Sequence, residues 1–102
     1  MFARKMPATP RLNLIVLRAR DADALARFYS ALGLSFARHR HGNGPEHFAH
    51  EEGSVVFEIY SAAASGPTQS LRLGFAVDDL ASTLATTLSS GATLVTPTAE
   101  SP

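Results

Sequence analysis

Glu58 is the residue whose type and surroundings indicate chemistry most clearly. It lies in the run SVVFEIY, residues 54–60, where β-branched and aromatic side chains occupy both faces of a predicted strand. A strand that is apolar on both faces is typical of a protein interior, and an unpaired carboxylate is too costly to keep ionised there. We therefore expect Glu58 to have a cation, a metal ion or a proton as its partner. Tyr60 shares the Glu58 face and is the aromatic residue that we expect to contact a ligand.

Four histidines form a second group that could do chemistry. His39 and His41 alternate onto the same face of a predicted strand, and His47 or His50 could join them across a hairpin to make an imidazole site for a metal ion. Exposed hairpin histidines are more common than metal sites, so the sequence by itself favours histidines without a metal ion.

A strand and a helix precede the Glu58 strand. Residues 11–18 alternate as a strand buried on both faces. Asp21 offers a side-chain oxygen to a helix N-terminus, and apolar residues recur at three- and four-residue spacing until Gly33 ends the helix. Residues 34–40 and 47–52 are then expected to form two further strands, joined by a turn rich in glycine and proline.

The second half of the chain repeats the beginning. Asp79 and Gly91 follow Asp21 and Gly33 at one constant offset, which indicates a duplicated strand-helix-strand unit. The expected elements are a flexible linker at residues 61–69, a strand at 71–77, a helix capped by Asp78 or Asp79 and ended by Gly91, and an extended segment at 93–96.

Composition excludes several classes of function. The chain has 102 residues, of which 45% are hydrophobic, with nine basic and nine acidic residues. We therefore expect one small domain with neither a nucleic acid nor a membrane as its partner. It has no cysteine, which excludes disulfides, thiolate zinc sites and a cysteine nucleophile. Residues 1–10 are expected to be a flexible leader, and without a signal peptide or a membrane-spanning run the default expectation is a cytoplasmic protein.

Three runs carry a family resemblance: LNLIVLRARDADALARFYSALGL, with Arg-Phe-Tyr before the Leu-Gly-Leu turn, then VVFEIY, and LRLGFAVDDL before the second helix. Their order and spacing resemble the vicinal oxygen chelate superfamily, which includes glyoxalase I, the bleomycin resistance proteins and the extradiol dioxygenases. The HGNGPEHFAHEEG run also resembles a small subgroup of glyoxalase-like proteins. The resemblance implies an α+β fold of paired βαβββ modules around a cavity, with the first module at residues 11–60 and a second, lacking its last two strands, at 70–102.

The resemblance also bears on metal binding. In metal-dependent members of the superfamily the ligands project from the first, fourth, fifth and eighth strands. The corresponding residues here are Leu14, Glu58 and Arg72, and the eighth strand has no counterpart. Leu14 has no donor atom and Arg72 repels a cation, so we expect neither this metal site nor another cofactor. Arg72 is instead expected to pair with Glu58 or to anchor the anionic group of a substrate.

The leading interpretation is a metal-free protein that binds a small molecule in the cavity between the modules, similar to the bleomycin resistance proteins. The expected ligand-binding residues are Leu14, Val16, Glu58, Tyr60 and Arg72, and Glu58 is the best candidate for a catalytic role that is otherwise unknown. Because a half-built module exposes strand edges and apolar surface, we expect a homodimer. Two alternatives remain open: a metal-dependent glyoxalase-like lyase or dioxygenase completed by further residues or a partner chain, and a degenerate domain that only dimerises.

Overall fold

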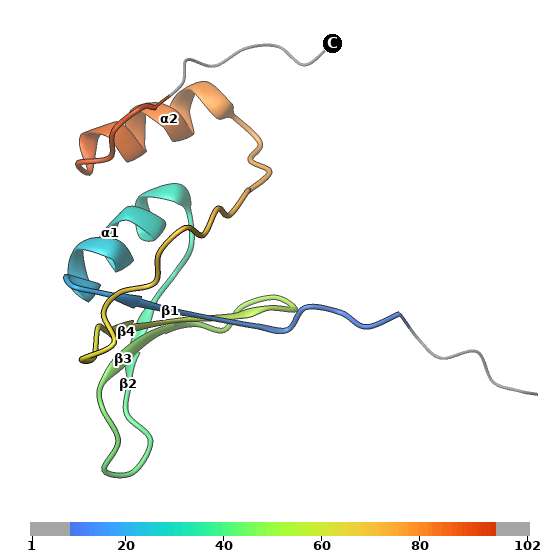
Figure 1. Cartoon of the computed structure of the whole chain (residues 1–102). Helices are drawn as coiled ribbons and strands as arrows, with labels where there is room; N and C mark the ends of the chain where they lie inside the picture. The colour runs from blue at the N-terminus through green and yellow to red at the C-terminus, as the bar shows by residue number, and fades with distance from the viewer. Residues whose placement is uncertain (1–8, 96–102) are drawn as a thin grey trace, which may run out of the picture.

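A four-stranded mixed sheet forms the base of the fold, and both helices lie on one side of it (Figure 1). The structure is a computed structural model, and it describes residues 9–95. The strand order is β1-β4-β3-β2, with β1 parallel to β4 and the other neighbours antiparallel. This is the α+β arrangement of one βαβββ module that the sequence predicts. The elements are β1 (Leu14–Ala19), α1 (Ala22–Leu32), β2 (Ala37–His39), β3 (His47–His50), β4 (Val56–Ser61) and α2 (Leu80–Ser89).

Helix α1 crosses one face of the sheet and supplies much of the buried core. Asp21 caps its N-terminus by accepting a hydrogen bond from the backbone N–H of Ala24 at 2.9 Å. Gly33 ends it with a φ of 123°, in the left-handed region that favours glycine. Both ends predicted from the sequence are therefore confirmed. The helix buries Ala26 and Tyr29 against the sheet.

The core lies between α1 and the strands β1 and β4. Ile59 is fully buried, and Leu17 and Phe57 are nearly so. The ring centroids of Tyr29 and Phe57 are 4.8 Å apart, and burial raises the pKa of the Tyr29 hydroxyl above its ordinary value. Because side chains alternate along a strand, the neighbours of these core residues point to the opposite face of the sheet.

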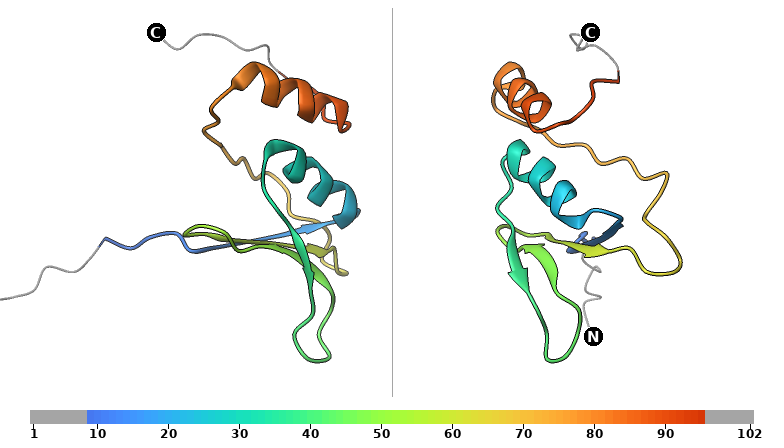
Figure 2. Two further views of the ribbon diagram at one scale, coloured as in Figure 1. Left: turned by 180° about the vertical axis from the view of Figure 1, so that it is seen from behind. Right: turned by 90° about the vertical axis from the view of Figure 1, so that its left-hand side faces the viewer.

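Strand β1 is buried on one face only, which corrects the sequence interpretation. The apolar alternation of residues 11–18 predicted a strand covered on both sides, but Leu14 and Val16 are 50% and 40% exposed, whereas Leu17 is buried. The reason is that α1 covers one face of the sheet, and no element of the described residues covers the other (Figure 2). The same holds for β4, whose core residues are buried while Glu58 is only partly buried.

Part of the segment 61–69 returns along the outer edge of β1. The Thr68 N–H donates to the Arg18 carbonyl oxygen at 2.9 Å, and the Arg18 N–H donates to Thr68 Oγ1 at 2.9 Å. Strand β1 is otherwise an edge strand, since β4 is its one neighbour in the sheet. Among the described residues, the beginning of β1, at Leu14 and Val16, therefore has no partner strand on its outer side.

Residues 71–77 do not form the strand that the sequence predicts. They run as an irregular segment toward α2, and Leu73 packs against the core while Arg72 is exposed. A strand needs a hydrogen-bonded neighbour, and none of the described strands pairs with this segment. Residues 93–95, expected as the start of another extended element, are likewise not a strand, and residue 96 lies outside the described residues.

Helix α2 confirms the capping signals of the second half. Its N-cap is Asp79, whose side chain accepts a hydrogen bond from the Ser82 N–H at 3.0 Å, and Gly91 follows the helix with a φ of 103°. The helix packs against α1 instead of covering a second sheet (Figure 1). The expected symmetry between the two halves is therefore limited to their helices and caps.

Two expectations concern the N-terminus and membranes. Residues 1–8 of the expected leader lie outside the described residues, as do residues 96–102. Within residues 9–95, neither helix has the length and hydrophobicity that a membrane span requires.

Candidate functional site

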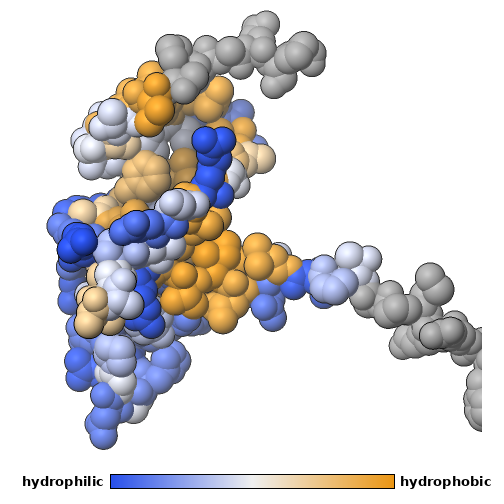
Figure 3. Space-filling view, in the orientation of Figure 1, coloured by the Kyte–Doolittle hydropathy of each residue, from blue (hydrophilic) through white to orange (hydrophobic). Residues whose placement is uncertain are grey.

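The sheet face opposite α1 carries most of the residues that the sequence singles out, and we call it the open face. The strand register places Val16 beside Glu58 and His39 beside His47, so side chains of neighbouring strands gather on one side. Figure 3 shows hydrophobic surface where β1 and β4 extend beyond the helix. The open-face residues discussed below are Leu14, Val16 and Arg18 of β1, His39 of β2, His47 of β3, and Glu58 and Tyr60 of β4.

The partner of Glu58 is His47 on the neighbouring strand. Glu58 Oε2 lies 3.1 Å from His47 Nε2, and these side chains are 16% and 1% exposed. The sequence predicts a cation, a metal ion or a proton beside this carboxylate, and an imidazole can supply a charge or a proton. Sequence reasoning assigned Arg72 to this role and missed the pair. Counting outward from the turn at Gly53 places Ala49 opposite Glu58, and His47 is then the next residue of β3 on the same face. That count could have identified His47 as a diagonal neighbour of Glu58.

The contact between His47 and Glu58 is close but poorly aligned. Although Oε2 is near, His47 Nε2 has no hydrogen-bond partner of good geometry among the described residues. The other ring nitrogen, Nδ1, lies 3.4 Å from the Pro45 carbonyl oxygen, which is long for a hydrogen bond. Leaving a buried polar group unsatisfied typically costs roughly 1–3 kcal/mol. His47 Nε2 is therefore the buried atom of the open face that would gain most from a bound group.

Stacked side chains of neighbouring residues hold the His47 ring in place on the open face. The Tyr60 and His47 ring centroids are 4.4 Å apart with planes 16° apart, and the Arg18 guanidinium lies over the Tyr60 ring at 5.0 Å. Toward the hairpin, the His41 ring lies 5.2 Å from the His47 ring. Aromatic and cation–π contacts of this kind contribute about 0.5–1.5 kcal/mol each. They fix the orientation of the His47 ring.

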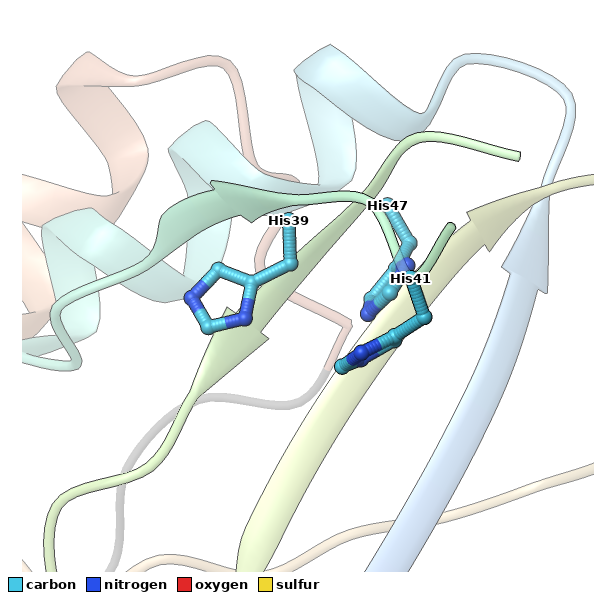
Figure 4. Close-up of side chains that lie close together, drawn as sticks. All are labelled: His39, His41 and His47. Carbon is cyan, nitrogen blue, oxygen red and sulfur yellow. The ribbon is translucent and has the colours of Figure 1, made fainter. Parts of the chain in front are cut away.

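Three of the four histidines come together on the β2–β3 hairpin (Figure 4). His39, His41 and His47 each offer one ring nitrogen, and these nitrogens lie within 4.8 Å of one another. The register explains the group, because it places His39 directly opposite His47. His50 pairs with a core position instead and its Nδ1 lies 2.8 Å from the Ser35 carbonyl oxygen. Of the two sequence alternatives, His47 and not His50 joins the group.

The positions that correspond to metal ligands in the superfamily do not fit a metal ion here. Leu14 offers no donor atom, and the exposed Arg72 lies in an irregular segment, not on a strand of the sheet that carries Glu58. Among the described residues Arg72 forms no ion pair with Glu58. A divalent ion needs several ligands, and the Glu58 carboxylate is the one donor that these positions provide.

Four of the five expected ligand-binding residues share the open face, and Arg72 is the exception. None of the five lines the cavity of about 460 Å³ between the end of α1, residues 75–79 and the start of α2. The Asp79 carboxylate in that cavity already bonds the α2 backbone. The open face combines the exposed apolar side chains of Leu14 and Val16 with the partly buried Glu58 and the unsatisfied His47 Nε2.

Comparison with known protein families agrees with the sequence motifs. A family model described as a glyoxalase-like domain matches residues 14–102. The matched range begins at the first residue of β1 and contains every helix and strand described above. None of the curated proteins compared with the chain gives a significant match.

Proposed function

The chain belongs to the family of glyoxalase-like domains, and on this premise we propose that it binds a small organic molecule on the open face of its sheet. In the superfamily that the sequence resembles, a curved sheet wraps around the ligand cavity, and the open face is the corresponding surface. The proposal does not depend on a metal ion at the superfamily's ligand positions, because Leu14 and Arg72 do not suit one.

The observation that carries the proposal is that large apolar side chains are exposed beside a partly buried carboxylate. Leu14 and Val16 are 50% and 40% exposed, and Val16 lies next to Glu58 in the register of β1 and β4. Ligand sites are mostly apolar, with a few polar groups that fix the orientation of the ligand. The open face suits a molecule with an apolar body and one hydrogen-bond donor or positive group directed at Glu58.

The proposal includes a homodimer in which a second copy covers the open face. A single sheet face gives a ligand one wall, whereas binding sites bury most of the ligand surface. The outer edge of β1 at Leu14 and Val16, which has no partner strand among residues 9–95, is continuous with the same face. A second copy placed there supplies the opposite wall.

Fragment binding followed by NMR tests the ligand site. The full chain is titrated with small aromatic amines as probes, and we expect shift changes at the backbone amides of β1 and β4. Leu14→Ser should weaken binding of a hit about tenfold, because the loss of one apolar contact is on the order of 1.4 kcal/mol. Leu80→Ser is the matched control, since Leu80 is similarly exposed (56%) but lies on α2.

Two results would contradict a ligand site on the open face. Shift changes confined to the cavity beside residues 75–79, together with equal binding by the wild type and Leu14→Ser, would move the ligand site away from the open face. A library that gives no hit on β1 or β4 would also count against it.

A further inference from the structure

We propose that His39, His41 and His47 form a binding site for a divalent transition-metal ion such as Zn²⁺. None of the three occupies a position that corresponds to a metal ligand of the superfamily. The site therefore differs from the one whose residues fail to fit an ion, and it adjoins the small-molecule surface at Glu58. It also departs from the sequence expectation that these histidines hold no ion.

The geometry of the three imidazoles is the first argument. Their ring nitrogens lie within 4.8 Å of one another. Zinc binds imidazole nitrogens at about 2.0–2.1 Å in tetrahedral sites, which places neighbouring ligand atoms about 3.4 Å apart. Closing the remaining gap requires movements of about 1 Å. His41 is exposed and follows the end of β2, so its side chain has room for this movement (Figure 4).

The unsatisfied nitrogen of His47 is a second and independent argument. This side chain is 1% exposed, and its Nε2 has no well-aligned hydrogen-bond partner among the described residues. When Nδ1–H donates toward the Pro45 carbonyl oxygen at 3.4 Å, Nε2 carries a free lone pair, which is the form of imidazole that binds metals. A cation bound at Nε2 satisfies this buried atom.

Neighbouring carboxylates make the place electrostatically suitable for a cation. Glu58 Oε2 lies 3.1 Å from His47 Nε2, and Glu51 Oε1 lies 3.3 Å from His39 Nδ1. Metal-binding histidines commonly have a carboxylate or a carbonyl oxygen at the ring nitrogen that does not bind the ion, which fixes the ring and strengthens the ligand. Glu51 at His39 Nδ1 and the Pro45 carbonyl oxygen near His47 Nδ1 can take this role, whereas Glu58 lies beside His47 Nε2, on the side where the ion binds. Because negative charge close to a partly buried site attracts a divalent ion strongly, the carboxylates favour a bound ion over an empty group.

The chemistry of the ligands selects the class of ion. Imidazole nitrogens suit Zn²⁺, Ni²⁺, Cu²⁺ and Fe²⁺, whereas Mg²⁺ and Ca²⁺ prefer oxygen ligands. Three imidazoles also leave a fourth position of a tetrahedral ion for water or an added ligand. We therefore expect the three histidines to bind Zn²⁺ and not to bind Mg²⁺.

Calorimetry with the full chain, freed of any affinity tag, tests the site. We expect one Zn²⁺ per chain and a rise in melting temperature on adding Zn²⁺ but not Mg²⁺. His39→Asn and His41→Asn should each weaken Zn²⁺ binding by at least about tenfold. These variants are chosen because both side chains are more exposed than His47, so their replacement should preserve the fold. The absorption spectrum of the wild type with Co²⁺ in place of Zn²⁺ reports the coordination geometry, because a tetrahedral Co²⁺ ion absorbs intensely.

His50→Asn is the matched control, because His50 lies on the same hairpin but outside the group. It should bind Zn²⁺ as the wild type does. Three results would overturn the site: no Zn²⁺ binding at concentrations well above that of the protein, binding unaffected by His39→Asn and His41→Asn, or an equal loss in His50→Asn. Half a Zn²⁺ per chain would also overturn it, since the ion would then lie between two copies.

Discussion

The imidazole of His47 connects the polar groups of the open face. It lies against the Tyr60 ring and the His41 ring, and its Nε2 approaches Glu58. A neutral imidazole carries one N–H donor and one lone pair, so it can donate a hydrogen bond or bind an ion, whereas an arginine can only donate. Glu58 therefore lies beside a ring that can either donate or accept, which suits a ligand or an ion at this place.

A double-mutant cycle should detect the coupling between His47 and Glu58. Each of His47→Leu and Glu58→Leu leaves the other polar group without its neighbour, so we expect each to lower the free energy of unfolding by about 1–3 kcal/mol. The double variant should lose less than the sum, because both polar groups are removed together. Urea denaturation of the four proteins gives the coupling energy, and strictly additive losses would show that the contact contributes nothing.

Arg72→Ala provides the contrasting case. The sequence predicts that Arg72 pairs with Glu58, but the side chain is exposed in the structure. We therefore expect the free energy of unfolding to change by less than about 0.5 kcal/mol. A loss of several kcal/mol in the same urea experiment would mean that Arg72 does meet a buried carboxylate.

Tyr29 should make the protein sensitive to alkaline conditions. Burial raises its pKa in the folded state above the ordinary value of 10.0. The stability that follows from this shift is fully present below about pH 10, and it is lost as the pH rises through 10 toward the folded-state pKa, because the unfolded chain releases its proton first. The free energy of unfolding measured between about pH 9 and pH 11 should fall less for Tyr29→Phe than for the wild type. Tyr60→Phe, as the control, should retain the fall.

The site was only partly predictable because its contacts depend on register. The alternation of His39 and His41 is local, and it correctly predicts a shared face. The meeting of His47 with Glu58 needs the alignment of β3 with β4, and a shift of one residue would send every side chain to the other face. Sequence resemblance assigned Arg72 to Glu58 on the assumption of a fifth strand, and that strand is not formed.

Among the secondary-structure elements, the position of each helix is determined by local capping residues, whereas each strand depends on a hydrogen-bonded neighbour elsewhere in the chain. Asp21 and Asp79 each cap a helix with a side-chain hydrogen bond, and both were predictable because a cap involves residues only three positions apart. Strand formation at residues 71–77 was not predictable in this way, since a strand requires a neighbour elsewhere in the chain. The prediction that β1 is buried on both faces was wrong for a related reason, because a strand covered on one face and a strand covered on both can have similar apolar patterns.

The N-cap of α2 can be tested with two adjacent aspartates. Asp79→Ala removes the acceptor for the Ser82 N–H, and we expect it to lower the free energy of unfolding by about 1 kcal/mol. Asp78→Ala removes a similar charge without removing the cap, so its effect should stay within about 0.5 kcal/mol. Urea denaturation followed by circular dichroism gives the free energy of unfolding of both variants. Equal losses would mean that the negative charge and not the cap stabilises the helix.

At the scale of the whole molecule, several large apolar side chains of the described residues are exposed to solvent. Leu14 and Val16 are exposed on the open face, and Leu80 and Leu88 on α2 are 56% and 40% exposed. Scattered apolar residues are common on protein surfaces, but contiguous ones mark places where another molecule docks. The pair on β1 is contiguous with the strand edge, which is why the proposed second copy is placed there.

Light scattering tests this assembly. We expect the full chain to be a dimer at micromolar concentration, and Val16→Lys to shift it toward monomer because a charge in an apolar interface is unfavourable. Leu88→Lys, which changes an equally exposed residue (40%) on α2, should leave the dimer intact. A monodisperse monomer for the wild type would contradict the homodimer.

The hydrogen bonds between Thr68 and Arg18 bear on aggregation. An unprotected edge strand is a template on which further chains can add without limit, as in amyloid fibres. Here the Arg18 N–H and carbonyl group are both occupied by Thr68, so an incoming strand can pair with only the first residues of β1. The segment after β4 thus blocks strand addition at Arg18 of β1, while within residues 9–95 the first residues of this strand remain free for one short, specific contact.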